Sequence, residues 1–177
     1  VIRKSLHHGV GLMDVVELEG SKKTYRLVPQ DGILLKPIQI DDVEKTKKLV
    51  VVKSKTTIKN GKTQIGFHDG KTLIDETPVL VGDTCVMQIP DIKILEVIKL
   101  EKGMNCLIIK GVNAGKIGKI DEIKEGTFSL PKSIDITLDD RKIEIPARLV
   151  MPIGKNKPVV TIRWLYDTGN TKYNERN

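Results

Sequence analysis

The chain has 177 residues, and its 39% hydrophobic content is enough for one large or two small buried cores. Thirty Lys and Arg residues against 23 Asp and Glu residues give a formal net charge of +7, which is typical of proteins that bind nucleic acid. Aromatic residues make up only 3% of the chain, so stacking platforms for single-stranded bases are excluded and a structured nucleic acid is favoured. No apolar run approaches the ~18 residues of a membrane span and no leader opens the chain, so we expect no membrane partner and a cytoplasmic location.

The Cys and His residues lack the spacing of a metal site. Cys85 and Cys106 stand singly inside apolar runs, so we predict buried, reduced thiols. His7, His8 and His68 are the only other soft ligands, and adjacent side chains point in opposite directions on a strand. We therefore expect no metal and no cofactor.

The first part of the chain is predicted to form short strands. Residues 1–12 show no core of their own and are interpreted as the remnant of a preceding domain. Turn residues then recur every eight to twelve positions, with Asn60-Gly61 as a strong hairpin signal, which is typical of a barrel or sandwich. We assign residues 13–100 to a central β domain. Its predicted strands are 13–18, 24–28, 49–52, 65–67, 72–74, 79–81 and 84–89.

One segment of this domain has a helical pattern. Asp41 and Glu44 stand at capping-box spacing, and Lys45, Lys47 and Lys48 fill the late turn, where cations complement the helix dipole. The sequence therefore predicts a short helix from Asp41 to Lys48, with its lysines on a solvated face.

The glycine-rich segment 103–120 carries the main functional prediction. Only three residues separate Gly111 from Gly115, and Ile117 follows Lys116, so the spacing of a triphosphate-binding loop is absent. A dinucleotide fingerprint is excluded because the chain continues with the period-two alternation of a strand. The segment is predicted to be a β-hairpin, and it resembles the KOW motif of small barrels in ribosomal proteins and elongation factors. Closure of a barrel would explain the glycines alone, but Lys110, Lys116 and Lys119 favour contact with RNA phosphates.

The following segments complete the strand count of an SH3-like barrel. Predicted strands cover 127–130, 134–138 and 142–145, with 147–153 closing the barrel. We assign residues 101–164 to a KOW barrel with a cationic loop at Gly154–Pro158 and a final strand, and residues 165–177 to a polar tail. The predicted fold class is mainly β, with two small barrel-like domains and one short helix in the first.

Several strings match one family in order along nearly the whole chain. They are Gly11-Leu-Met-Asp-Val-Val16, Tyr25-Arg-Leu27, Val81-Gly-Asp83, the segment from Gly111 to Gly118, and Ile153-Gly-Lys-Asn-Lys-Pro158. On these strings the chain resembles the archaeal and eukaryotic ribosomal protein S4e family of the small subunit. The resemblance implies a central β domain and a C-terminal KOW barrel, preceded by an RNA-binding domain that we expect to be largely missing here.

The resemblance also implies the partners. These are small-subunit rRNA and neighbouring ribosomal proteins, with no small-molecule substrate and a location on the ribosome. We predict that the glycine loop and the residues after Ile153 form one continuous RNA-binding surface. Its candidate residues are Lys110, Gly111, Asn113, Gly115, Lys116, Lys119, Lys155, Lys157 and Arg163.

Two other functions stay open from the sequence. A transcription-elongation or translation-factor fragment with a KOW motif would use its barrel to bind protein. An enzyme would need convergent acid, base or nucleophile groups, but the Asp and Glu pairs fall in different turns and no Ser, Cys or Lys has a recognised nucleophile setting. We therefore expect no catalytic activity.

Overall fold

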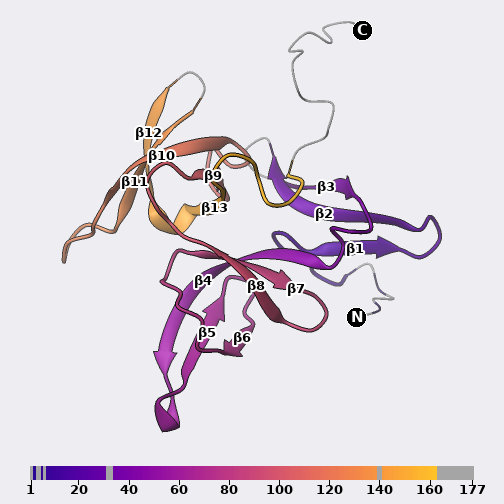
Figure 1. Cartoon of the computed structure of the whole chain (residues 1–177). Coiled ribbons are helices and arrows are strands. Elements are labelled where there is room, and N and C mark those ends of the chain that lie inside the picture. Colours follow the sequence, from indigo (N-terminus) through magenta and orange to yellow (C-terminus); the bar gives the residue numbers. More distant parts are fainter. Residues whose placement is uncertain (1, 3–4, 6, 31–33, 139–140, 163–177) are drawn as a thin grey trace, which may run out of the picture.

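The computed structural model describes residues 2, 5, 7–30, 34–138 and 141–162. Within this part of the chain there are thirteen strands and two short 3₁₀ turns, so the predicted mainly-β fold is confirmed (Figure 1). The strands are β1 (Val15–Leu18), β2 (Lys23–Gln30), β3 (Leu34–Ile40), β4 (Lys47–Thr57), β5 (Thr63–Phe67), β6 (Thr72–Ile74), β7 (Thr84–Gln88), β8 (Lys93–Ile98), β9 (Asn105–Ile108), β10 (Ile117–Lys124), β11 (Ser133–Thr137), β12 (Lys142–Pro146) and β13 (Val150–Gly154). The 3₁₀ turns are η1 (Lys59–Gly61) and η2 (Ala147–Leu149).

The strands form three antiparallel sheets. Their orders are β1-β2-β3, β6-β5-β4-β7-β8 and β12-β11-β10-β9-β13. In the third sheet, η2 alone joins the two edge strands β12 and β13, so the sheet must curve strongly to bring its edges together. Five strands with this curvature agree with the predicted SH3-like strand count, while closure into a barrel stays a prediction.

Strand β4 shows why apolar residues can follow one another in this fold. Successive side chains of a strand point to opposite faces, and both faces of β4 are covered. Leu49 and Val51 enter a central core, whereas Val50 and Val52 enter a second core with Phe67. The run 49–52 is therefore buried on both sides, as a two-sided strand requires.

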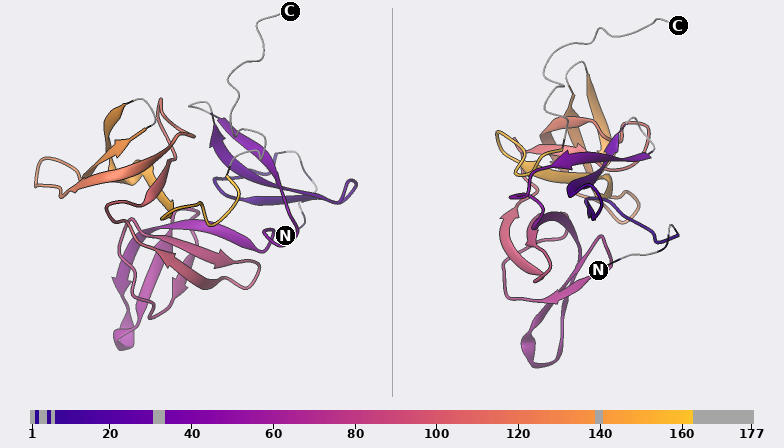
Figure 2. Two further views of the ribbon diagram at one scale, coloured as in Figure 1. Left: turned by 45° about the horizontal axis from the view of Figure 1, so that its top comes forward. Right: turned by 90° about the vertical axis from the view of Figure 1, so that its right-hand side faces the viewer.

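The central core is shared by all three sheets and by the segment 159–162. Its buried residues are Met13, Val28, Ile38, Leu49, Val51, Val86, Ile98, Leu107, Ile109, Met151, Ile153, Val160 and Ile162. The sheets surround this core, and the segment that follows β13 runs from the third sheet towards the first (Figure 2). The assignment of 13–100 and 101–164 to two domains stays a prediction, since one core connects residues of both.

The predicted helix from Asp41 to Lys48 is wrong. This segment forms turns, in which Glu44 N–H donates to Asp41 O at 3.0 Å and Lys47 N–H donates to Glu44 O at 3.0 Å, and β4 begins at Lys47. The buried Arg26 guanidinium donates to Glu44 O and to Lys47 O, at 3.2 and 3.0 Å, and so uses two carbonyl groups that a helix would point along its axis. None of the helices in the described residues is long or apolar enough to span a membrane.

Three predicted strands also differ from the structure. Residues 79–81 and 159–162 are irregular, although Val79 and Val160 are buried, because their side chains pack into cores without strand pairing. Residues 127–130 form the tip of the β10–β11 hairpin instead of a strand. The predicted tail, 165–177, lies outside the described residues.

The predicted buried thiols are confirmed. Cys85 and Cys106 are both free and fully buried. Burial raises the pKa of each thiol to about 12, so both stay protonated at neutral pH. They act as small apolar side chains in two separate cores.

Candidate nucleic-acid interface

The predicted hairpin at the glycine loop is confirmed. Strands β9 and β10 pair antiparallel, with Ile117 opposite Leu107, and residues 109–116 connect them. Gly115 N–H donates to Ile108 O at 2.8 Å, and Ile108 N–H donates to Lys116 O at 3.0 Å, so the base of the loop is closed by two backbone hydrogen bonds. The loop is an ordered structure that holds its side chains in place.

Gly111 and Gly115 have different structural roles. Both have positive φ angles, 90° and 87°, which favour glycine. A Cβ atom at Gly115 would lie 2.7 Å from Gln30 Cα and 2.7 Å from Pro29 O, whereas a Cβ at Gly111 would meet nothing within 4 Å. Gly115 therefore allows the loop to pack directly on the backbone of β2, and Gly111 serves only the turn.

Lys110 lies beside cations from two other parts of the chain. Lys53 Nζ donates to Arg148 O at 3.1 Å, and Ile109 N–H donates to Leu149 O at 2.9 Å, which keeps the loop next to η2. Burial lowers the pKa of Lys53, and the positive charges of Lys110 and Arg148 lower it further. Since like charges repel more strongly where water is partly excluded, these three cations form a site that favours an anion.

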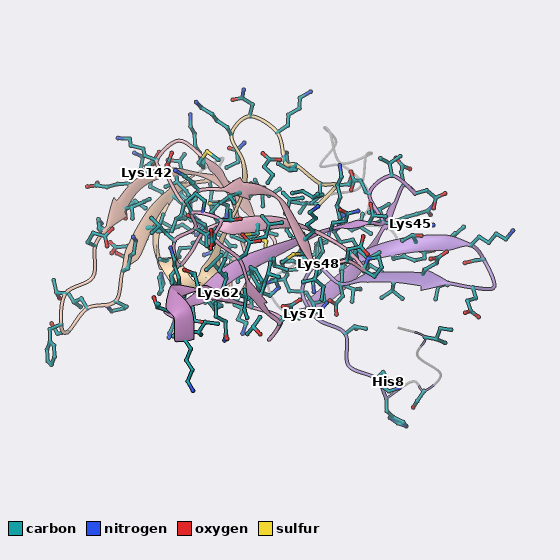
Figure 3. All side chains as sticks on the ribbon, turned by 60° about the horizontal axis from the view of Figure 1, so that its bottom comes forward. His8, Lys45, Lys48, Lys62, Lys71 and Lys142 are labelled. Carbon is teal, nitrogen blue, oxygen red and sulfur yellow. The ribbon has the colours of Figure 1, made fainter. Side chains whose placement is uncertain are left out.

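These cations border a cavity of about 920 Å³, which we call the basic hollow. Its walls come from the segment 9–12, β4, the turn 68–71, the glycine loop and η2. In Figure 3, Lys48 and Lys71 lie near the middle of the molecule, where these elements meet. Within the described residues, no carboxylate pairs with four of the five cations of the hollow, which are Lys53, Lys71, Lys110 and Arg148.

The fifth cation of the hollow, Lys48, is neutralised. Its buried ammonium donates to Asp14 Oδ1 at 2.8 Å and to Asp69 Oδ2 at 2.7 Å. Burial alone would lower the pKa of Lys48, but the two carboxylates outweigh it and the pKa is raised. Gly11 N–H donates to the other Asp14 oxygen at 2.7 Å, so this network fastens the N-terminal segment to the wall of the hollow.

His68 stands in the same wall as a neutral ring. Its Nδ1 accepts a hydrogen bond from Val51 N–H at 3.1 Å, so the proton is on Nε2, which lies 3.3 Å from Leu12 O and can donate to it. Burial lowers the pKa of His68. The ring is therefore a structural hydrogen-bonding group, and within the described residues no group of three or more His, Cys, Asp or Glu side chains could hold a metal ion.

The remaining predicted residues lie elsewhere. Three of them, Lys119, Lys155 and Lys157, are exposed. They lie near the start of β9, because Asn105 pairs with both Lys119 and Gly154. The side-chain amide of Asn105 also donates to Asn156 O at 3.3 Å. The glycine loop follows the other end of the four-residue strand β9, so the two loops lie at opposite ends of this strand, and one continuous surface made from both stays a prediction. Alternation along a short strand gives no information on which end of it a distant loop will reach.

Asn113 and Arg163 complete the predicted set. Asn113 Oδ1 accepts from Arg141 Nη2 at 3.0 Å, so this side chain bridges the glycine loop to the start of β12. Lys116 is exposed beside it on the loop. Arg163 lies outside the described residues.

Sequence reasoning missed Lys53, Lys71 and Arg148. A register shift between Val52 and Ser54 places Lys53 at a β-bulge, which re-aims a side chain, and no residue pattern foretells it. Arg148 is a single cation in a three-residue turn, and only its tertiary contact with β4 reveals a role. Three basic residues spread over 96 positions have no local signal in common.

The chain is similar in sequence to known ribosomal proteins. The sequence profile described as Ribosomal family S4e matches residues 21–94. The small ribosomal subunit protein eS4 of Methanosphaera stadtmanae is 34% identical over 160 residues, which cover 90% of this chain and 66% of the relative. That of Staphylothermus marinus is 34% identical over 174 residues, which cover 91% of this chain and 68% of the relative. The chain thus spans about two thirds of the length of these relatives and is similar to ribosomal proteins of the small subunit.

The chain is also similar to a solved structure. The crystal structure of the 30S ribosomal protein S4e from Thermoplasma acidophilum matches with a TM-score of 0.70 and 29% identity, covering 83% of this chain and 73% of that chain. The chain belongs to the ribosomal protein S4e family. The resemblance inferred from the sequence is confirmed.

Proposed function

We propose that this protein is a structural constituent of the small ribosomal subunit that binds rRNA, with the basic hollow as its principal phosphate contact. The observation that carries the proposal is the convergence of Lys53, Lys71, Lys110 and Arg148 around one cavity, with no carboxylate partner among the described residues. These side chains come from β4, the turn between β5 and β6 of the same sheet, the glycine loop and η2. The central core joins β4, through Leu49 and Val51, to the glycine loop, through Ile109.

Phosphate is the ligand that this arrangement favours. Crowding of Lys53 by two other cations opposes its charged form, and a bound phosphate group would relieve that repulsion. Lys and Arg side chains that face phosphates account for most sequence-independent RNA affinity. The names of the relatives, small ribosomal subunit protein eS4, support rRNA as the source of the phosphates.

A second, separate contact completes the proposed interface. Lys119, Lys155 and Lys157 are exposed at the start of β9 and offer a smaller set of cations. On the glycine loop, Lys116 and the turn at Gly111 face solvent, whereas Gly115 and Asn113 support the loop through contacts within the protein. We assign the chain no catalytic activity, and we place it on the ribosome in the cytoplasm with rRNA and neighbouring ribosomal proteins as partners. The alternative of a transcription-elongation or translation factor has less support, because the relatives named above are ribosomal proteins.

Two charge-matched variants test the proposal. The hollow variant changes Lys53, Lys71, Lys110 and Arg148 to Gln. The paired variant changes to Gln four lysines that already pair with carboxylates: Lys45, Lys124, Lys132 and Lys142. Both variants lose four positive charges, so only the location of the charge differs.

Binding to purified small-subunit rRNA is measured over a range of salt concentrations. Each phosphate contact contributes about 0.9 to the slope of log affinity against log salt on a duplex. We expect the slope of the hollow variant to be shallower by up to about three to four units and that of the paired variant to stay near the parent. Equal slopes for the two variants would remove the hollow from the interface. Thermal unfolding of each variant verifies that the fold is intact.

A further inference from the structure

The tip of the β10–β11 hairpin, residues 125–132, presents apolar side chains that no part of the described chain covers. Phe128 is fully exposed and Leu130 is 66% exposed. The chain has two Phe residues, and the other one, Phe67, is buried in the second core. An ordered, fully exposed Phe in a chain with so few aromatic residues indicates a surface that another molecule covers.

The tip is a folded turn. Thr127 N–H donates to Leu130 O at 2.8 Å, and Leu130 N–H donates to Thr127 Oγ1 at 3.2 Å. A Cβ on Gly126 would lie within 3.0 Å of Lys132 N and Leu130 O, so the two arms of the turn approach closely at its base. Phe128 lies within this closed turn, so little conformational entropy would be lost when a partner binds.

The hairpin differs in charge from the rest of the protein. Residues 117–137, which form this hairpin, contain four Asp or Glu and three Lys, a net charge of −1 in a chain of net charge +7. The lysines near the tip are neutralised, since Lys124 pairs with Asp135 and Glu144, and Lys132 pairs with Glu125. Such a surface repels phosphates, and binding to a single-stranded base by stacking also needs cations along the backbone.

The tip is remote from the basic hollow. It follows the last residue of β10, whereas the glycine loop precedes the first. Eight residues of strand separate the two by up to about 25 Å. The hairpin projects away from the other two sheets in both figures that show the ribbon alone (Figures 1 and 2).

We propose that the hairpin tip docks into an apolar pocket bordered by Lys or Arg on a neighbouring protein of the particle. The inference rests on the proposed function, because it takes the particle to be the small ribosomal subunit. Phe128 and Leu130 supply the apolar contact, and the acidic flanks provide charge complementarity to a basic protein surface. The protein thus contacts rRNA with its basic hollow and a second protein with the opposite end of β10.

Site-specific photo-crosslinking in assembled subunits tests the tip. In the full-length protein, p-benzoylphenylalanine replaces Phe128 in one variant and Val112, which is 92% exposed on the glycine loop, in the control. We expect Phe128→p-benzoylphenylalanine to crosslink to a basic, apolar segment of one other ribosomal protein and the control to crosslink to rRNA. A crosslink from position 128 to rRNA or to a second copy, or no crosslink at all, overturns the proposal. A control that yields no rRNA contradicts the proposed function while leaving the result at position 128 readable.

Substitution provides a second measurement. Phe128→Ser is expected to lower the retention of the protein on subunits in a salt wash by at least about tenfold, because an apolar anchor is lost. Phe128→Leu keeps an apolar side chain and is expected to keep most of the retention. Affinity of the isolated protein for rRNA should not change with either variant. Equal retention of parent and Phe128→Ser contradicts the docking, and a parallel loss of rRNA affinity assigns the tip to the RNA interface instead.

Discussion

The contact between Gly115 and strand β2 makes a sharp prediction about stability. A Cβ at this position would lie 2.7 Å from Gln30 Cα and from Pro29 O, which are backbone atoms that cannot rotate away. Gly115→Ala therefore combines a positive-φ penalty of about 1 to 2 kcal/mol with an overpacking penalty of about 1 to 3 kcal/mol. Gly111 has nearly the same φ but open space around it, so Gly111→Ala should cost only the first amount.

Comparing Gly115→Ala with Gly111→Ala separates the cost of packing against β2 from the cost of the positive φ angle. Urea and thermal unfolding of the two variants are compared with the parent, and each kcal/mol should lower the Tm by about 2 to 4 °C in a chain of this length. We expect Gly115→Ala to unfold at a clearly lower temperature than Gly111→Ala. If the two variants lose the same stability, the loop does not pack on β2 as described, and the position of Lys110 in the hollow would need another cause.

Three further substitutions test buried groups. Glu44→Gln leaves the guanidinium of Arg26, which is fully buried, without its counter-charge, and should cost about 3 to 5 kcal/mol in urea unfolding at pH 7. Burial by itself would raise the pKa of Glu44, but hydrogen bonds from Thr161 and Arg26 outweigh burial, so the pKa is lowered. The stabilisation by Glu44 should therefore fade as the pH falls below about 4, and the Tm values of parent and variant should converge there. Burial lowers the pKa of His68, so the unfolded chain binds the proton more tightly than the folded chain. The Tm of the parent should therefore drop as the pH falls below about 6.5, and that of His68→Gln should drop less. Equal slopes of Tm against pH for the two proteins between pH 7 and 5 would contradict a buried neutral ring. Lys48→Met should cost about 3 kcal/mol, with the advantage of the parent present below about pH 10.5 and lost above the raised pKa, as pH-dependent unfolding would measure.

Local patterns in the sequence determined the fold class, many of the strands and the family. Period-two alternation and turn residues predicted a mainly-β chain, and the glycines at 111 and 115 predicted a tight hairpin, because strand pairing and positive φ depend on neighbouring residues. Single cysteines inside apolar runs were enough to predict buried thiols. The ordered strings between Gly11 and Pro158 were enough to identify the S4e family.

Tertiary contacts decided the rest. The helical pattern from Asp41 to Lys48 was overruled because Arg26, 18 positions before Glu44, takes up its carboxylate and two backbone carbonyls. The cations of the hollow are brought together by a β-bulge and by packing around one core, and both depend on residues far apart in the chain. Lys155 and Lys157 were separated from the glycine loop by the direction of one strand pairing. A local pattern predicts a strand or a turn, but only the packed sheets decide which lysines are buried, as Lys48 is, and which other charges lie beside each lysine.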